Sequence, residues 1–154
     1  MSRRKWMLSG LALAAGVALA AFLAPWPQDE DLVAPETVAL GQQVYGEHCA
    51  SCHGATLEGE TPEWRTRKDN GSLPAPPHDE TGHTWHHPDQ QLFAITKRGI
   101  APFAPEGYVS DMPAFGDVLS DREIWAVLAY IKSTWPPETL RIQQERTAQA
   151  AKGG

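Results

Sequence analysis

The residues that most clearly indicate chemistry are Cys49 and Cys52, three positions apart and followed directly by His53. Two thiols at this spacing can each add to one of the two vinyl groups at a haem edge, and the next residue then places its imidazole under the iron. A thioredoxin-type redox pair would need a βαβ context, and a zinc site would need a second cysteine pair. The sequence has neither, so the motif predicts one covalently attached haem c with His53 as an axial iron ligand.

A haem iron has a second axial position, and its occupant decides between electron transfer and ligand binding. The chain has three methionines, of which Met1 and Met7 fall in an apolar N-terminal segment. The third, Met112, lies in a predicted loop, whereas methionines that merely fill a core mostly lie on helical faces. We therefore expect Met112 to be the distal ligand.

A stretch of ten residues contains four further histidines: His78, His83, His86 and His87. Three interpretations of this loop remain open. It packs against the haem edge, it binds a second metal such as copper or zinc, or one of its histidines replaces Met112 on the iron. We favour the first, because buried haem propionates need hydrogen-bond donors. Trp85 and Arg98 are the predicted propionate donors.

Three to four short helices with long loops are expected to position these residues, because apolar side chains recur at helical spacing in only a few segments. The segments that carry this spacing are 35–49, 88–98 and 121–135. Pro35 suits a first helical position, and Gly99 a helix stop. Ser120 and Glu123 form a capping box, and Pro136 ends the last segment. No alternating strand pattern is present, which predicts an all-α fold.

Taken together, these features resemble the class I cytochromes c, the small monohaem bacterial and mitochondrial type. The resemblance covers roughly Pro35 to Trp135 and rests on the haem motif, the Met-Pro loop and the helices on either side. It implies the cytochrome c fold, with the first and last helices of the domain crossing closely. Gly41 and Tyr45 would then meet Val127 and Tyr130.

The resemblance also implies how the iron ligands are held and used. The second ring N–H of His53 would donate to a backbone carbonyl of a proline-containing loop, for which 73–77 is the candidate. His53 and Met112 would let the iron cycle between ferric and ferrous states without opening a substrate site. We therefore expect an electron carrier rather than an enzyme. The sequence offers no carboxylate pair, nucleophile–base pair or phosphate loop that would suggest hydrolase or transferase chemistry.

The N-terminal residues have the pattern of a targeting segment. Arg3, Arg4 and Lys5 precede 19 uncharged residues, 6–24, which is typical of an export signal or a membrane anchor. The length of the run favours an anchor over a cleaved signal. The predicted organisation is a signal peptide or anchor over 1–27, a tether over 28–34, the haem domain over 35–136 and a polar, frayed C-terminal tail over 137–154.

The charge limits the range of partners. The formal net charge of −6 argues against nucleic-acid binding, which needs a basic face. We expect redox protein partners instead: a donor dehydrogenase or cytochrome complex and an acceptor oxidase or reductase, with the membrane as a further partner if the anchor is retained. The expected location is the periplasmic side of a bacterial inner membrane. The alternative function is copper handling or haem-based sensing that uses loop 78–87.

Overall fold

The computed structural model describes residues 34–153, and this part of the chain is helical with no strand. The predictions for the segment 1–27, for its apolar helix and for nearly all of the tether lie outside the described residues. Five α-helices are present, together with the one-turn 3-10 helices η2 (Thr84–His86) and η3 (Ala101–Phe103). The α-helices are α3 (Pro35–His48), α4 (Ala50–His53), α5 (Asp89–Arg98), α6 (Asp121–Ser133) and α7 (Pro137–Lys152). The all-α prediction is confirmed, and no helix among these residues is long and apolar enough to cross a membrane.

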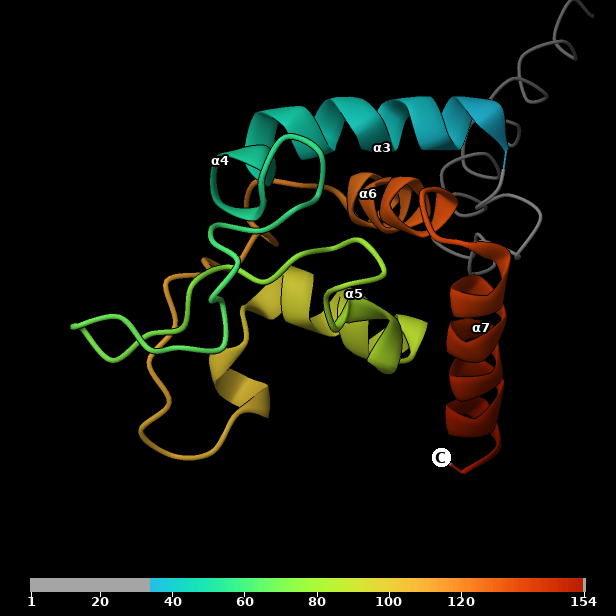
Figure 1. The fold of residues 1–154 in the computed structure, drawn as a ribbon. Helices are drawn as coiled ribbons and strands as arrows, with labels where there is room; N and C mark the ends of the chain where they lie inside the picture. The colour runs from blue at the N-terminus through green and yellow to red at the C-terminus, as the bar shows by residue number, and fades with distance from the viewer. Residues whose placement is uncertain (1–33, 154) are drawn as a thin grey trace, which may run out of the picture.

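The core is built around the crossing of α3 over α6 (Figure 1). The crossing is close because Gly41 has no side chain. A Cβ at that position would collide with the Ala126 backbone and lie 2.8 Å from Tyr130 Cβ. The Tyr45 ring packs against the Tyr130 ring at 5.4 Å between centroids. The predicted meeting with Tyr130 is confirmed, although the atoms nearest to Gly41 belong to Ala126 and not to Val127.

Local signals at the helix ends behave as predicted. Pro35 opens α3, where its missing N–H needs no partner. Gly99 follows α5 with a φ of 74°, a left-handed conformation that favours glycine. At the start of α6, the Ser120 side chain accepts from the Glu123 N–H, and the Glu123 carboxylate accepts from the Ser120 N–H. The start of α3, the end of α5 and the start of α6 are therefore fixed by local sequence.

The prediction of a frayed C-terminal tail is wrong. Residues Pro137–Lys152 form α7, which packs against η2 and stands at the side of the molecule (Figure 1). The physical reason is that Pro137, which follows the proline expected to end the preceding helix, suits the first position of a new helix. The anchor of α7 is Gln143, which is fully buried and donates from Nε2 to Asp89 Oδ1 at 2.7 Å.

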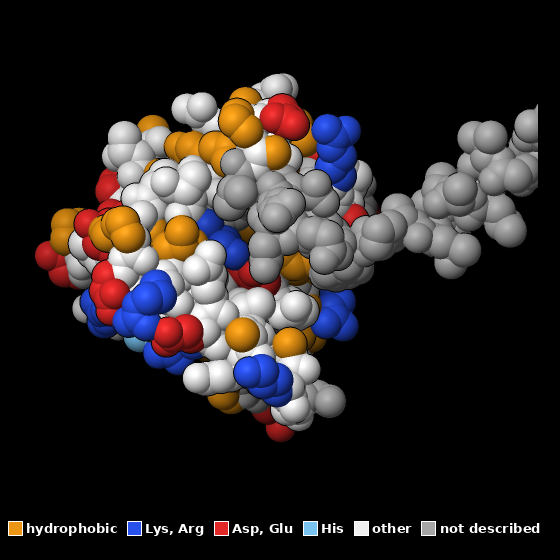
Figure 2. Space-filling model, turned by 90° about the vertical axis from the view of Figure 1, so that its right-hand side faces the viewer, with side chains coloured by type: hydrophobic (Ala, Val, Ile, Leu, Met, Phe, Trp, Pro, Cys, Tyr) orange, Lys and Arg blue, Asp and Glu red, His pale blue; other side chains and the backbone are white. Residues whose placement is uncertain are grey.

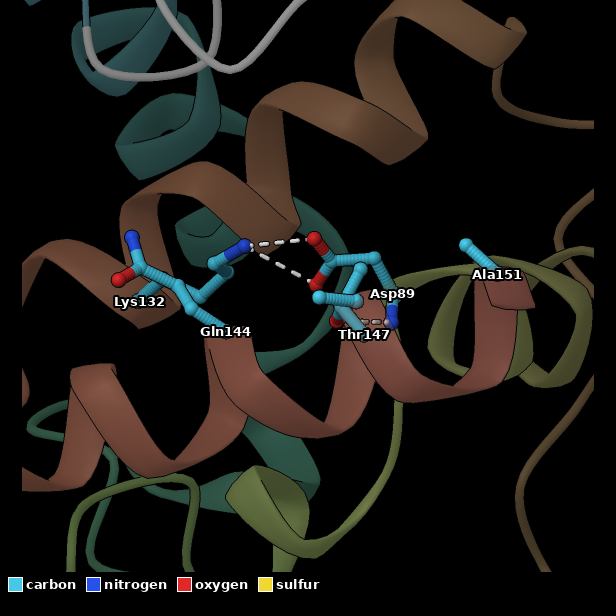
Figure 3. A pocket seen from close by; sticks show the side chains of 6 residues that line it. Asp89, Lys132, Gln144, Thr147 and Ala151 are labelled. Atoms are coloured by element: carbon cyan, nitrogen blue, oxygen red, sulfur yellow. Dashed lines mark hydrogen bonds and ion pairs between the residues drawn. The ribbon is translucent and has the colours of Figure 1, made fainter. Parts of the chain in front are cut away.

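A buried ion pair completes this anchor. Lys132 of α6 donates to both carboxylate oxygens of Asp89, at 2.8 and 3.0 Å, and Asp89 N–H donates to Thr147 Oγ1 of α7 at 3.1 Å (Figure 3). These residues line a small open pocket of about 240 Å³ between α5, α6 and α7. Leu140 of α7 also packs against the core, but the buried residue of the helix is the polar Gln143, so its docking leaves no wide apolar stripe in the sequence.

Candidate haem site

The haem motif occupies a single helical turn at the end of α3. Cys49 links α3 to α4, and Cys52 and His53 lie in α4. The His53 N–H donates to the Cys49 carbonyl at 2.9 Å, and the Cys52 N–H donates to the same carbonyl at 3.1 Å, so one carbonyl organises the turn. Both cysteines are free thiols rather than a disulfide. One turn of the chain therefore carries both thiols and the imidazole, as thioether formation and iron ligation require.

His53 is held in one orientation. Its side chain is nearly buried, at 8% exposed, and its Nδ1 lies 2.8 Å from the Pro76 carbonyl oxygen. With the proton on Nδ1, the ring donates to this carbonyl and keeps the Nε2 lone pair for a metal. The carbonyl belongs to the proline-containing loop 73–77, which confirms that prediction. Burial lowers the pKa of His53 and outweighs the hydrogen bond to Pro76, so the imidazole is held in its neutral, metal-binding form.

The chemistry of the cysteines also fits haem c. Burial, helped by the neighbouring Cys52, raises the pKa of the Cys49 thiol to about 11. The site thus disfavours a charged sulfur at this position and accepts a neutral one. A thioether, like the protonated thiol, is a neutral sulfur, so this buried position tolerates the attached form. Cys49, Cys52 and His53 together suit a covalently attached haem with an imidazole-ligated iron.

His78 proves to be part of the pocket behind His53. Its ring stacks on the His53 ring at 3.9 Å between centroids, with the planes 20° apart. Its Nδ1 lies 2.7 Å from Thr84 Oγ1, and its backbone carbonyl accepts from Trp135 Nε1 at 2.7 Å. An imidazole stacked on the His53 ring would lie on the same side of a bound iron as His53. His78 therefore cannot be the opposite axial ligand.

The sequence analysis did not separate His78 from the other histidines of the loop. The available signal was its position two residues after Pro76, the residue whose carbonyl orients His53. Burial and the neighbouring His53 ring hold the pKa of His78 well below its usual value. A neutral imidazole therefore packs behind the proximal ligand, while packing of the loop against the haem edge stays a prediction.

Met112 lies in the loop between η3 and α6, and its side chain is partly buried. The preceding residue, Asp111, fixes the loop from one side. Its carboxylate accepts from Ser72 Oγ at 2.6 Å and from Lys68 Nζ at 3.2 Å, and these two donors lower its pKa. Sequence reasoning missed this anchor, because nothing in the local pattern links residues about forty positions apart.

The loop is fixed from the other side by α5. The Phe115 N–H donates to the Thr96 carbonyl at 3.1 Å, and the Gly116 N–H donates to the Lys97 carbonyl at 2.9 Å. These bonds satisfy two of the carbonyls that a helix leaves free at its C-terminal end. Met112 is thus held between two anchored points, while its role as the distal ligand stays a prediction.

The two predicted propionate donors have other contacts. Trp85 Nε1 donates to the Glu80 carbonyl at 3.2 Å, and its ring stacks on His86 at 3.7 Å between centroids. The Arg98 guanidinium, exposed at the end of α5, lies 4.8 Å from the Phe103 ring centroid. Their use by haem propionates stays a prediction.

Comparison with known proteins agrees with this geometry. The family model described as Cytochrome c matches residues 38–135, more than half of the chain. The matched segment contains Cys49, Cys52, His53, Pro76 and Met112. No curated protein matches the chain.

Proposed function

We propose that this chain, which belongs to the cytochrome c family, carries single electrons between a periplasm-facing donor and an acceptor such as a terminal oxidase or reductase. Membership of the family establishes a haem electron-transfer protein with covalently attached haem c. The identity of the partners, the closed axial site and the cellular location are our proposals.

The observation that carries the proposal is the fixed orientation of His53 beside two free thiols. When bound, haem c supplies an iron that gains or loses one electron. The chain holds His53 neutral and aimed by the Pro76 carbonyl, and the two free cysteines would hold the porphyrin by covalent bonds. These constraints keep the ligand geometry the same in both oxidation states, which favours fast electron transfer over substrate chemistry.

Met112 completes the proposal as the distal ligand. A thioether favours ferrous iron, so this ligand predicts a reduction potential on the positive side. The anchors on both sides of Met112, at Asp111 and at the end of α5, limit how far the thioether can move. A closed site of this kind binds no substrate, and we propose a carrier rather than an enzyme.

The proposed location rests on the sequence of the N-terminal segment, in which three basic residues precede the uncharged run. The proposed contact with redox partners is transient, as is usual for small electron-transfer complexes. On the face shown in Figure 2, described Lys and Arg side chains are interspersed with Asp and Glu side chains. The excess of negative charge therefore forms no single patch on that face that would select a strongly basic partner.

The decisive experiment is an absorption spectrum of the purified ferric protein, followed by addition of carbon monoxide to the reduced form. A weak far-red sulfur-to-iron band and no reaction with carbon monoxide are the expected results. Without that band, Met112 is not the ligand. Reaction with carbon monoxide would then indicate a haem-based sensor or enzyme with an open site, and no reaction would indicate a second imidazole on the iron.

A further inference from the structure

We propose that His83 and His87 form a binding site for a divalent transition-metal ion, separate from the haem iron. The Nε2 atoms of the two side chains lie 3.1 Å apart on one short turn of the chain. The proposal does not depend on the identity of the distal haem ligand or of the redox partners.

The separations within the pair fit two ligands of one metal. The ring centroids are 4.8 Å apart and the planes are 84° apart. If both Nε2 lone pairs point at one metal about 2 Å from each nitrogen, the length of a Zn–N bond, the centroids must lie farther apart than the nitrogens. The observed centroid and nitrogen separations stand in the ratio that this arrangement requires. A linear N–H···N hydrogen bond, the preferred geometry, would hold the ring centres farther apart at the same nitrogen separation.

The turn that presents the two imidazoles is fixed from several sides. His83 and His87 flank η2, and the His86 N–H donates to the His83 carbonyl at 3.1 Å. Thr84, the buried residue of η2, is bonded to His78 in the proximal pocket. The His87 carbonyl accepts from Gln143 Nε2 of α7 at 3.2 Å. A metal would therefore meet two ligands that are already in place, which lowers the entropic cost of binding.

The residues around His83 and His87 determine which further ligands and which metals the site can have. No group of three or more His, Cys, Asp or Glu side chains suited to a metal occurs within residues 34–153, so water would fill the remaining positions. His86 is the nearest further imidazole, but its ring lies 5.8 Å from that of His83 and is stacked on Trp85. Imidazole ligands suit Zn²⁺, Ni²⁺ and Cu²⁺, and the general order of stability places Cu²⁺ as the tightest.

The test is calorimetric titration of the tag-free ferric holoprotein with Zn²⁺ and with Cu²⁺. We expect one equivalent of each to bind, with Cu²⁺ the tighter. His83→Ala and His87→Ala should each weaken binding by roughly tenfold or more, because each removes one of two ligands. His86→Ala is the matched control and should leave the affinity within about twofold, since its ring is not one of the two convergent ligands.

Unchanged haem absorption in each variant shows that the fold is intact. If the His87→Ala protein does not accumulate, the loss of metal affinity is measured instead in His83→Gln, because His83 is exposed and tolerates substitution. The electron paramagnetic resonance spectrum of the Cu²⁺-loaded ferric protein should show nitrogen hyperfine structure that disappears in His83→Ala. Absence of binding, or binding that survives both substitutions, would overturn the proposal. So would an affinity that falls in His86→Ala but not in His87→Ala.

Discussion

The two sides of the haem site are held by different means. On the His53 side, the imidazole is 8% exposed, bonded to the Pro76 carbonyl and stacked on His78. Met112, the ligand predicted for the other side, lies in a loop that contains the exposed Val118, at 62% exposed, and the buried Leu119, at 5%. That loop depends on the polar contacts of Asp111 and on the end of α5.

The difference indicates which side can change without loss of the fold. The His53 side is continuous with the core, since Tyr45 of the α3–α6 crossing also donates to the Gly54 carbonyl at 2.8 Å. A substitution there acts on packing and on ligation together. Met112 and Asp111 lie in the part of the loop held by polar contacts, whereas Phe115 and Leu119 further along pack in or against the core, so a substitution at Met112 or Asp111 should act mainly on the iron. Four predictions test this contrast.

The largest effect is expected for His53→Ala. The substitution removes the ligand whose orientation the pocket fixes and leaves the Pro76 carbonyl without its donor. The yield of six-coordinate haem protein should fall to a small fraction of the parent value, measured by haem content and by the absorption spectrum. A six-coordinate protein in normal yield would contradict the assignment of His53.

Met112→Ala should have a large effect on the iron and a small one on the fold. The far-red band should disappear and the reduced protein should bind carbon monoxide. The reduction potential should fall by on the order of 0.1 V or more, because axial ligands set haem potentials over a range of about 0.8 V. Circular dichroism should show the parent helix content. A retained far-red band would show that another residue is the ligand.

Asp111→Asn should weaken the hold on Met112 without removing the ligand. Loss of the carboxylate breaks the ion pair with Lys68 and the charge-assisted bond from Ser72. On heating, the far-red band should be lost several degrees earlier, with a smaller shift in the loss of helix. Asp117→Asn, an exposed carboxylate of the same loop, is the matched control. Equal shifts in both variants would show that Asp111 has no special role.

The smallest effect is expected for His78→Leu. An aliphatic side chain makes the surroundings of His53 less polar, which disfavours the charged ferric state, so the potential should rise modestly. The far-red band should persist, because Met112 is not involved. Thr84→Val removes only the hydrogen bond to His78 and should shift the potential less. An unchanged or lower potential in His78→Leu would contradict this role for the ring.

What the sequence could predict follows from how local each signal is. The haem motif and the ends of α3, α5 and α6 depend on residues a few positions apart, and the structure contains all of them. The family resemblance predicted that His53 donates to a backbone carbonyl of loop 73–77, and the structure identifies this carbonyl as that of Pro76.

The failures involve polar contacts between distant residues. Helix α7 was missed because Gln143, Asp89 and Lys132 attach it, and an apolar periodicity does not reveal such an anchor. The hydrogen bond between Ser72 and Asp111 was missed for the same reason, as was the stacking of His78 on His53. Hydrophobic spacing identifies which helices form, whereas the loops and the last helix are placed by hydrogen bonds that only the folded chain brings together.

The crossing at Gly41 has a consequence for the order of events during synthesis. Helix α3 finds its partner only when α6, more than seventy residues later, has been made. A chain that emerges N-terminus first therefore presents Cys49 and Cys52 on an open turn well before its own core can close. Until α6 docks, the two thiols lie on a turn that no closed core covers, so haem attachment does not require a completed fold.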